Sequence, residues 1–305
     1  MAVWVMIAAL LAILWGVGWR LSDFALNPKR FDPELTRKEE LERCGVTGAE
    51  YDAWPKESFS LQSRYGYRLC GHLLPASQQQ QGPARVVVMV HGHGTNRDAE
   101  LSYAVLFRSL GYHTVLYDHR NFGESDRRPT TMGKCEAEDL ETVCNWVRRR
   151  FGEDCILGTH GVSMGGATVM LHSAMDDKLA FVVEDCGYSD LTAQLSFVMR
   201  TVYHLPPRLL MPLCYLVAWM RTGVWFPKIR PAEAVAKSEM PMLFIHGALD
   251  TYVPFWMLQA NFDAKTKGIK KQQVFENAAH AMSFASDPEL YRRTVTEFLQ
   301  QIGQL

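Results

Sequence analysis

The sequence has no surplus of either charge. It carries 32 lysines and arginines against 33 aspartates and glutamates, so its formal net charge is −1. Without a basic excess there is no field to neutralise the phosphates of a nucleic acid. A zinc-finger spacing and an RNA-binding signature are also absent. We therefore expect no nucleic-acid partner and look for chemistry on a small molecule.

Cysteine pairs are missing as well. The seven cysteines form no C-x-x-C motif, and three of them, Cys70, Cys155 and Cys186, lie in or beside apolar runs. An odd, scattered set favours buried thiols in a reducing compartment over a disulfide framework.

Charge is missing altogether from the N-terminal stretch between Ala2 and Trp19. These eighteen residues are just enough to span a bilayer core, and Trp4, Trp15 and Trp19 stand where interfacial aromatic residues are preferred. We predict a transmembrane helix over residues 1–20. A cleaved signal peptide is the alternative, but a basic n-region and a small-x-small site before the first arginine are missing.

Basic residues follow this stretch, whereas only the terminal amine precedes it. Because positive residues flank the cytoplasmic side of a membrane span, we predict that the rest of the chain lies in the cytoplasm. Residues 21–56 are charged and interrupted by three prolines, so we expect a connecting segment with one short helix over residues 34–43. The basic residues are Arg20, Lys29, Arg30, Arg37 and Lys38.

Residues 57–305 have the pattern of one α/β domain. Two alternating segments, 57–63 and 67–75, predict an antiparallel hairpin at a sheet edge, and the polar stretch 77–83 predicts an exposed loop. Short continuous apolar runs follow, separated by helical segments of which 136–151 is the clearest. This repeated order predicts a mostly parallel, doubly wound sheet of eight strands. The apolar runs are residues 85–90, 112–117, 154–159, 179–184, 241–246 and 271–275.

One interval, residues 187–240, interrupts this order and is rich in Leu, Met, Tyr and Phe. Its longest uncharged stretch, Leu209 to Met220, is too short to cross a bilayer. We predict that the interval forms a helical cap over a pocket. Extra core packing and a second membrane contact are the alternatives.

A serine bracketed by glycines stands between a predicted strand and a predicted helix. Residues 161–165 read G-x-S-x-G with Ser163 at the centre, which is the pattern of a nucleophile elbow. The glycines remove side chains that would collide with the neighbouring strand and helix, so the serine oxygen projects at a helix N-terminus. A glycine-rich turn with a capping serine is the alternative.

A nucleophilic serine needs a base that is oriented by a carboxylate. Asp250 follows the predicted strand 241–246 and His280 follows the next one, which gives the chain order Ser, Asp, His. We predict that these two complete the site with Ser163. Asp185 is the competing acid. Four other histidines are expected to be structural, and they are His72, His113, His172 and His204; His246 is expected to have a packing role.

The oxyanion of such a reaction needs two amide donors. Met164 N–H follows the nucleophile, and His93 N–H lies in the HGHG stretch after the strand 85–90, with Gly94 as the alternative. His91 and His93 are not expected to bind a metal, because no acidic or cysteine cluster accompanies them. We expect no cofactor.

From about residue 57 to the end, the chain resembles the α/β-hydrolases of the serine esterase, lipase and peptidase type. The motifs that carry the resemblance occur in the family's order, and they are HGHG (91–94), YDHRNFGES (117–125), GVSMGG (161–166), HGALDTYVP (246–254) and ENAAHAMSF (276–284). In form the chain resembles the bacterial membrane-anchored hydrolases grouped with serine aminopeptidase-like and lysophospholipase-like domains. Asn121 departs from the glycine that relatives often have.

The resemblance implies an α/β-hydrolase fold and a Ser-His-Asp triad but no particular substrate. We predict hydrolysis of carboxylic esters through an acyl-enzyme, with a hydrophobic or lipid-like acyl substrate. A peptidase or amidase on the same triad is the first alternative, and a non-catalytic, membrane-tethered binding scaffold is the second. We expect a monomer without an obligate protein partner, attached to the membrane by its N-terminal helix.

Overall fold

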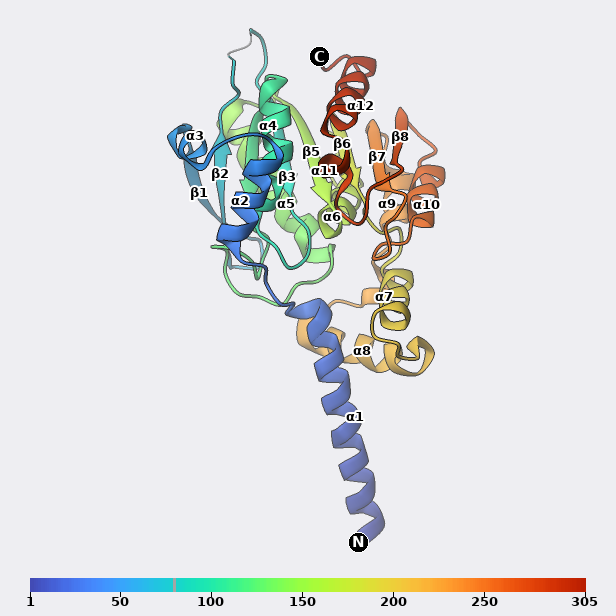
Figure 1. Ribbon diagram of the computed structural model, residues 1–305. Helices are drawn as coiled ribbons and strands as arrows, with labels where there is room; N and C mark the ends of the chain where they lie inside the picture. The colour runs from blue at the N-terminus through green and yellow to red at the C-terminus, as the bar shows by residue number, and fades with distance from the viewer. Residues whose placement is uncertain (79–80) are drawn as a thin grey trace.

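A sheet covered by helices on both faces forms the body of the computed structural model, and one long helix projects from it (Figure 1). The structure describes residues 1–78 and 81–305. Residues 79–80 of the exposed loop predicted over 77–83 lie outside the described residues.

The sheet has eight strands in the order β1-β2-β4-β3-β5-β6-β7-β8. The first two form the predicted antiparallel hairpin at the edge, and the strands from β4 to β8 pair in parallel. The mostly parallel, eight-stranded sheet predicted from the sequence is confirmed. The strands are β1 Glu57–Gln62, β2 Arg68–Leu74, β3 Arg85–Val90, β4 His113–Tyr117, β5 Ile156–Val162, β6 Phe181–Asp185, β7 Met242–Gly247 and β8 Lys270–Phe275.

Two apolar clusters lie on the two faces of this sheet. One joins the sheet to α4 (Leu101–Ser109) and α12 (Pro288–Gln301). The other joins it to α5 (Lys134–Phe151), α6 (Met164–His172) and α10 (Trp256–Ala264). Because the central strands are covered on both sides, their sequences are continuously apolar rather than alternating.

The interval predicted as an inserted cap is helical. Helices α7 (Leu191–Thr201) and α8 (Pro207–Thr222) lie beside the end of the projecting helix, away from the sheet (Figure 1). The last helix of the interval, α9 (Pro231–Lys237), packs instead against α6 and α10. The cap therefore ends before α9, which belongs to the layer over the sheet.

The projecting helix α1 spans Ala2–Leu26 and is long and apolar enough to cross a membrane, a test that a signal sequence also passes. It continues past the predicted end at residue 20, because the next residue that cannot extend a helix is Pro28. Its last turns pack against α8.

The segment 21–56 is more than the connecting segment predicted from its prolines. Besides the end of α1 it contains α2 (Pro33–Arg43), close to the predicted helix 34–43, and α3 (Gly48–Ala53). Leu41 and Tyr51 are buried in the apolar cluster that contains α4 and α12. The segment therefore covers part of one sheet face.

Candidate active site

Ser163 stands at the turn between β5 and α6, as predicted. Its backbone has φ 59° and ψ −116°, a region that residues with a side chain rarely adopt. The backbone N–H of Ser163 donates to the carbonyl of Asp185 at 2.8 Å, which ties the turn to the end of β6. The surrounding structure thus holds the serine in a strained conformation.

The flanking glycines are required by close backbone contacts. A Cβ on Gly165 would lie 1.8 Å from the carbonyl oxygen of Val90, and a Cβ on Gly161 would lie 2.4 Å from the carbonyl oxygen of Gly165. Both distances are far below a normal contact, so only glycine fits at either position. The bracketing pattern in the sequence therefore has a steric cause.

The structure brings the three predicted side chains together. The Ser163 hydroxyl lies 2.9 Å from Nε2 of His280, and Nδ1 of the same ring lies 2.7 Å from Oδ2 of Asp250. Asp250 follows β7 and His280 follows β8, and the carboxyl ends of parallel strands share one edge of the sheet. The geometry permits a proton to pass between the hydroxyl and the imidazole while the carboxylate orients the ring.

Asp250 is held as an anion by several donors. The backbone N–H groups of Tyr252 and Val253 donate to its Oδ1 at 2.8 and 2.9 Å. Burial alone would raise the pKa of this carboxyl, but hydrogen bonds from His246 and His280 and the charge of His280 outweigh burial and hold its pKa well below the usual range.

His246 is the residue whose position sequence reasoning missed. Its Nε2 lies 3.2 Å from Oδ2 of Asp250 and 3.1 Å from the carbonyl of Val253, so it has more than a packing role. Burial lowers the pKa of His246, but the hydrogen bond to Asp250 and the charges of Glu184 and Asp250 give a net rise. The available signal was its position four residues before the predicted acid.

Asp185, the competing acid, is bonded to a serine, whereas Asp250 is bonded to the imidazole. Its Oδ1 accepts a hydrogen bond from the Ser283 hydroxyl at 2.9 Å. Burial raises the pKa of Asp185 to about 6. Asp185 therefore supports the segment after His280 rather than the ring itself.

The two predicted amide donors lie near Ser163. Met164 is the first residue of α6, where backbone N–H groups have no acceptor within the helix. A Cβ on Gly92 would lie 3.5 Å from Cβ of Ser163, so the HGHG stretch that contains His93 runs beside the serine. The side chain of His93 bonds through Nε2 to the carbonyl of Ala25 at 2.9 Å.

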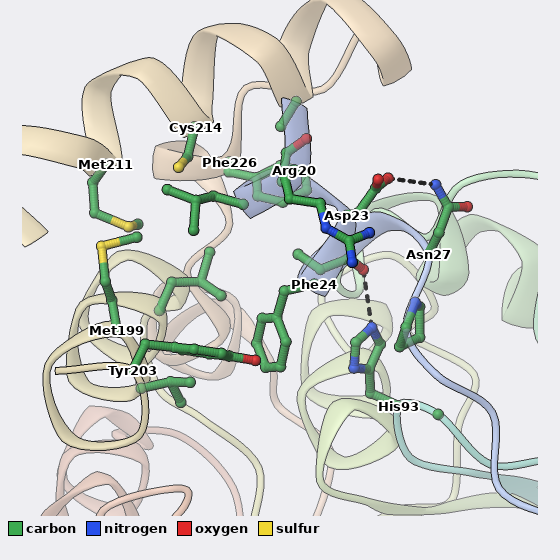
Figure 2. A pocket seen from close by; sticks show the side chains of 18 of the residues that line it. Arg20, Asp23, Phe24, Asn27, His93, Met199, Tyr203, Met211, Cys214 and Phe226 are labelled. Atoms are coloured by element: carbon green, nitrogen blue, oxygen red, sulfur yellow. Dashed lines mark hydrogen bonds between the residues drawn. The ribbon is translucent and has the colours of Figure 1, made fainter. Parts of the chain in front are cut away.

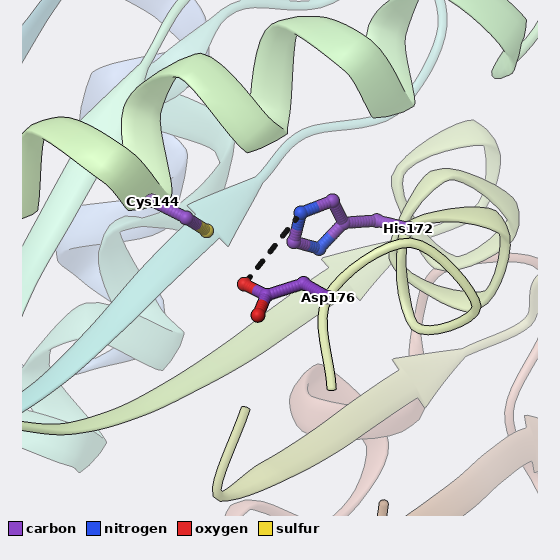
Figure 3. Close-up of side chains that lie close together, drawn as sticks. All are labelled: Cys144, His172 and Asp176. Atoms are coloured by element: carbon purple, nitrogen blue, oxygen red, sulfur yellow. Dashed lines mark ion pairs between the residues drawn. The ribbon is translucent and has the colours of Figure 1, made fainter. Parts of the chain in front are cut away.

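Two groups of side chains lie close enough to share a metal ion, among the residues that the structure describes. One, Cys186 with Asp250 and His280, overlaps the site above. The other is Cys144, His172 and Asp176 (Figure 3).

The second group lacks available anionic ligands. Arg148 already pairs with Asp176 at 2.6 Å, His172 bonds to Glu141 at 2.8 Å, and burial raises the pKa of the Cys144 thiol well above its ordinary value. Metal ligands must be deprotonated, so this group fits a structural network better than a metal centre.

Asn121, the departure noted in the sequence, joins the N-terminal segment to the domain. It has φ 73°, which asparagine tolerates better than most residues. Its side chain accepts a hydrogen bond from Arg30 at 2.7 Å and donates to the carbonyl of Leu26 at 3.1 Å. A glycine here would lack both contacts.

Two cavities meet beside the candidate site. The smaller, about 490 Å³, is lined by Ser163 and His280. The larger, about 630 Å³, lies between the end of α1 and the helices α7 and α8 (Figure 2). His93 and Phe31 line both cavities, so the two adjoin at these residues.

Comparisons with known proteins show the family and the fold. A family model described as alpha/beta hydrolase fold matches residues 85–209. The uncharacterised protein YqkD of Bacillus subtilis is 30% identical over 97% of this chain and 96% of its own. The lysophosphatidylserine lipase ABHD12 of Danio rerio is 24% identical over 71% of this chain and 61% of its own.

A solved structure shares the fold as well. The esterase Pf2001 of Pyrococcus furiosus superimposes with a TM-score of 0.69 at 21% identity, covering 91% of this chain and 98% of that chain.

Proposed function

This chain belongs to the α/β-hydrolase family, and from that premise we propose that it is a serine hydrolase that cleaves carboxylic esters through an acyl-enzyme on Ser163. The observation that carries the proposal is the hydrogen-bonded path from the Ser163 hydroxyl through His280 to Asp250. A serine hydroxyl is a weak nucleophile near neutral pH, and this path supplies the base and the carboxylate that it needs.

The reaction has two halves. His280 takes the proton of Ser163 while the oxygen attacks the ester carbonyl carbon, and the N–H groups of His93 and Met164 stabilise the oxyanion. The imidazolium then gives its proton to the departing alcohol, which leaves an acyl-serine. Water, deprotonated by the same His280, attacks this acyl group. The imidazolium then returns the proton to the Ser163 oxygen as the acid is released, which restores the free serine and the neutral imidazole. Asp250 stabilises the imidazolium in both halves.

The acidic residues of the interval that contains the cap do not favour an aminoacyl amide over an ester. Recognition of a substrate α-amine needs a free carboxylate, but the acidic residues of the interval 187–240 are engaged. Asp190 caps α7, Glu233 pairs with Arg230, and Glu239 pairs with Lys267. A panel of esters and aminoacyl amides of matched acyl groups should give measurable kcat/KM only with the esters.

A hydrophobic acyl group suits the surroundings of the site. The larger cavity is mainly apolar, and two similar proteins are named a lipase and an esterase. The acyl chain is the part of such a substrate that apolar walls can bind.

The helix α1 is proposed to span the membrane, with the domain in the cytoplasm. Most of the side chains of α1 are exposed in the structure, and a bilayer would cover them. Cleavage as a signal peptide near residue 20 would remove Gly18 and Trp19, which contact Leu213 and Arg221 of α8. Protease added to intact cells should leave the domain undigested; digestion without lysis would contradict this orientation.

The triad is tested by Ser163→Ala in the full chain purified in detergent. Hydrolysis of p-nitrophenyl acetate should fall by at least about 10³-fold, and labelling by a fluorophosphonate should disappear. Ser60→Ala, an exposed serine of β1 outside the proposed reaction, is the control and should keep the label. Retained labelling of Ser163→Ala would show that another serine reacts.

A further inference from the structure

We propose that the cavity between α1 and the cap is the acyl-chain site of the enzyme, and that the N-terminal helix, besides its proposed role as an anchor, forms one wall of that site. This inference rests on the proposed ester hydrolysis. The cavity, about 630 Å³, is within the usual size of ligand pockets.

Apolar side chains from three helices face the cavity. Figure 2 shows Met199 of α7 and Met211 of α8 pointing toward one another, with Cys214 beside them. Phe24 of α1 lies opposite and packs edge-on against Tyr203 with ring centroids 5.3 Å apart. Methionine side chains adapt their shape to a flexible chain, so these walls suit an unbranched acyl group.

The cavity adjoins the proposed reaction centre through residues that touch it. The Tyr252 ring, which lines it, lies 4.9 Å from the His280 ring between centroids. His93, which lines both cavities, is the residue that we propose as an oxyanion donor. The acyl group of a carbonyl held at Ser163 can therefore extend past His93 into the larger, mainly apolar cavity.

The last turns of α1, which form one wall of the cavity, are held in place by hydrogen bonds on two sides. Arg221 of α8 bonds to Ser22 at 2.9 Å and Asp23 at 2.7 Å, and its guanidinium lies 4.1 Å from the Trp19 ring centroid. At the other side, the carbonyl of Ala25 accepts the bond from His93. The last turns of α1 thus connect the cap to the HGHG stretch.

The test measures kcat/KM of the full chain in detergent for p-nitrophenyl esters with acyl chains of increasing length. Each additional buried methylene should raise kcat/KM about fourfold. Met199→Trp, which fills the cavity, should reduce the long-chain rate at least tenfold relative to the acetate rate of the same variant. Met199→Ala, which enlarges it, should move the preference toward longer chains even if the tryptophan variant does not fold.

The contribution of α1 is tested by Phe24→Ala, with Trp15→Ala, an exposed residue of the same helix, as the matched control. Only Phe24→Ala should change the chain-length profile. The same variants are assayed with monoacylglycerols in phosphatidylcholine vesicles, which separates a membrane source of the acyl chain from a dissolved one. Chain-length profiles that match the unaltered chain in all cavity variants, in both arms, would overturn the inference while leaving ester hydrolysis intact.

A failure of the proposed function gives a different result. A chain that hydrolyses no ester can still be tested for binding of a fluorescent twelve-carbon fatty acid. Binding that Met199→Trp abolishes and Trp15→Ala preserves would support the acyl site without the reaction. Equal binding by both variants would overturn it.

Discussion

Gly165 shows how one missing side chain shapes the site. Its Cβ position lies 1.8 Å from a backbone oxygen of β3, which cannot move without breaking the sheet. We expect Gly165→Ala to lower the free energy of unfolding by about 3 kcal/mol, measured by urea denaturation. Gly48→Ala, where nothing lies within 4 Å of the added carbon, should change it by less than about 0.5 kcal/mol. Equal losses in both variants would contradict the steric argument.

Asp139 should make stability depend on pH. It is fully buried and accepts hydrogen bonds of 2.6 Å from Ser63 and Tyr67, and burial raises its pKa to about 7. In the unfolded chain the pKa of an aspartate is about 3.9. At pH values between the two pKa values the folded chain binds a proton that the unfolded chain does not, so the free energy of unfolding falls as pH rises.

The variant Asp139→Asn removes this titration. The free energy of unfolding of the unaltered chain, relative to that of the variant, should therefore fall between pH 5 and pH 7. The decrease should be up to about 1.4 kcal/mol for each pH unit. Thermal unfolding at a series of pH values measures it. A difference that does not vary with pH would show that the carboxyl does not titrate in this range.

Among the elements, α1 and α8 depend on each other through Arg221, which is mostly buried between them. Arg221→Ala should cost about 1.5 kcal/mol and release the end of α1, so that trypsin cleaves faster after Arg20 or Lys29. Arg208→Ala, an exposed change on the same helix, should leave the cleavage rate unaltered. Unchanged cleavage in Arg221→Ala would show that other contacts hold the two helices.

The boundaries of helices and strands were predicted well where the hydrophobic pattern of the sequence follows directly from burial in the sheet. The hairpin and the continuous apolar strands were predicted correctly, because the hydrophobic pattern of a strand follows from how the sheet buries it. The end of α1 and the place of α9 were not predictable in this way, because tertiary packing decides both. The charge of Arg20 does not indicate that α1 continues and packs against α8. The composition of residues 231–237 does not indicate that α9 packs against α6 and α10.

At the scale of the whole molecule, the N-terminal helix has two unequal parts. Deleting residues 1–26 should expose the face of α8 that packs on α1 and lower the Tm by about 5–10 °C. Deleting residues 2–14 removes only the projecting part and should shift the Tm by less than about 2 °C. Differential scanning fluorimetry in one detergent compares them, and equal shifts would show that the packed turns add no stability.

The sequence by itself determined the sheet, the strained turn at Ser163 and the identity of Asp250 and His280 as its neighbours, because these follow from local sterics, from hydrophobic period and from the rule that parallel strands end at one edge. Tertiary structure alone decided that His246 also faces Asp250, that Asp185 bonds to Ser283, and that the end of α1 closes a cavity against α7 and α8. Those contacts join residues with no shared period or motif, so only the packing of distant segments brings them within reach.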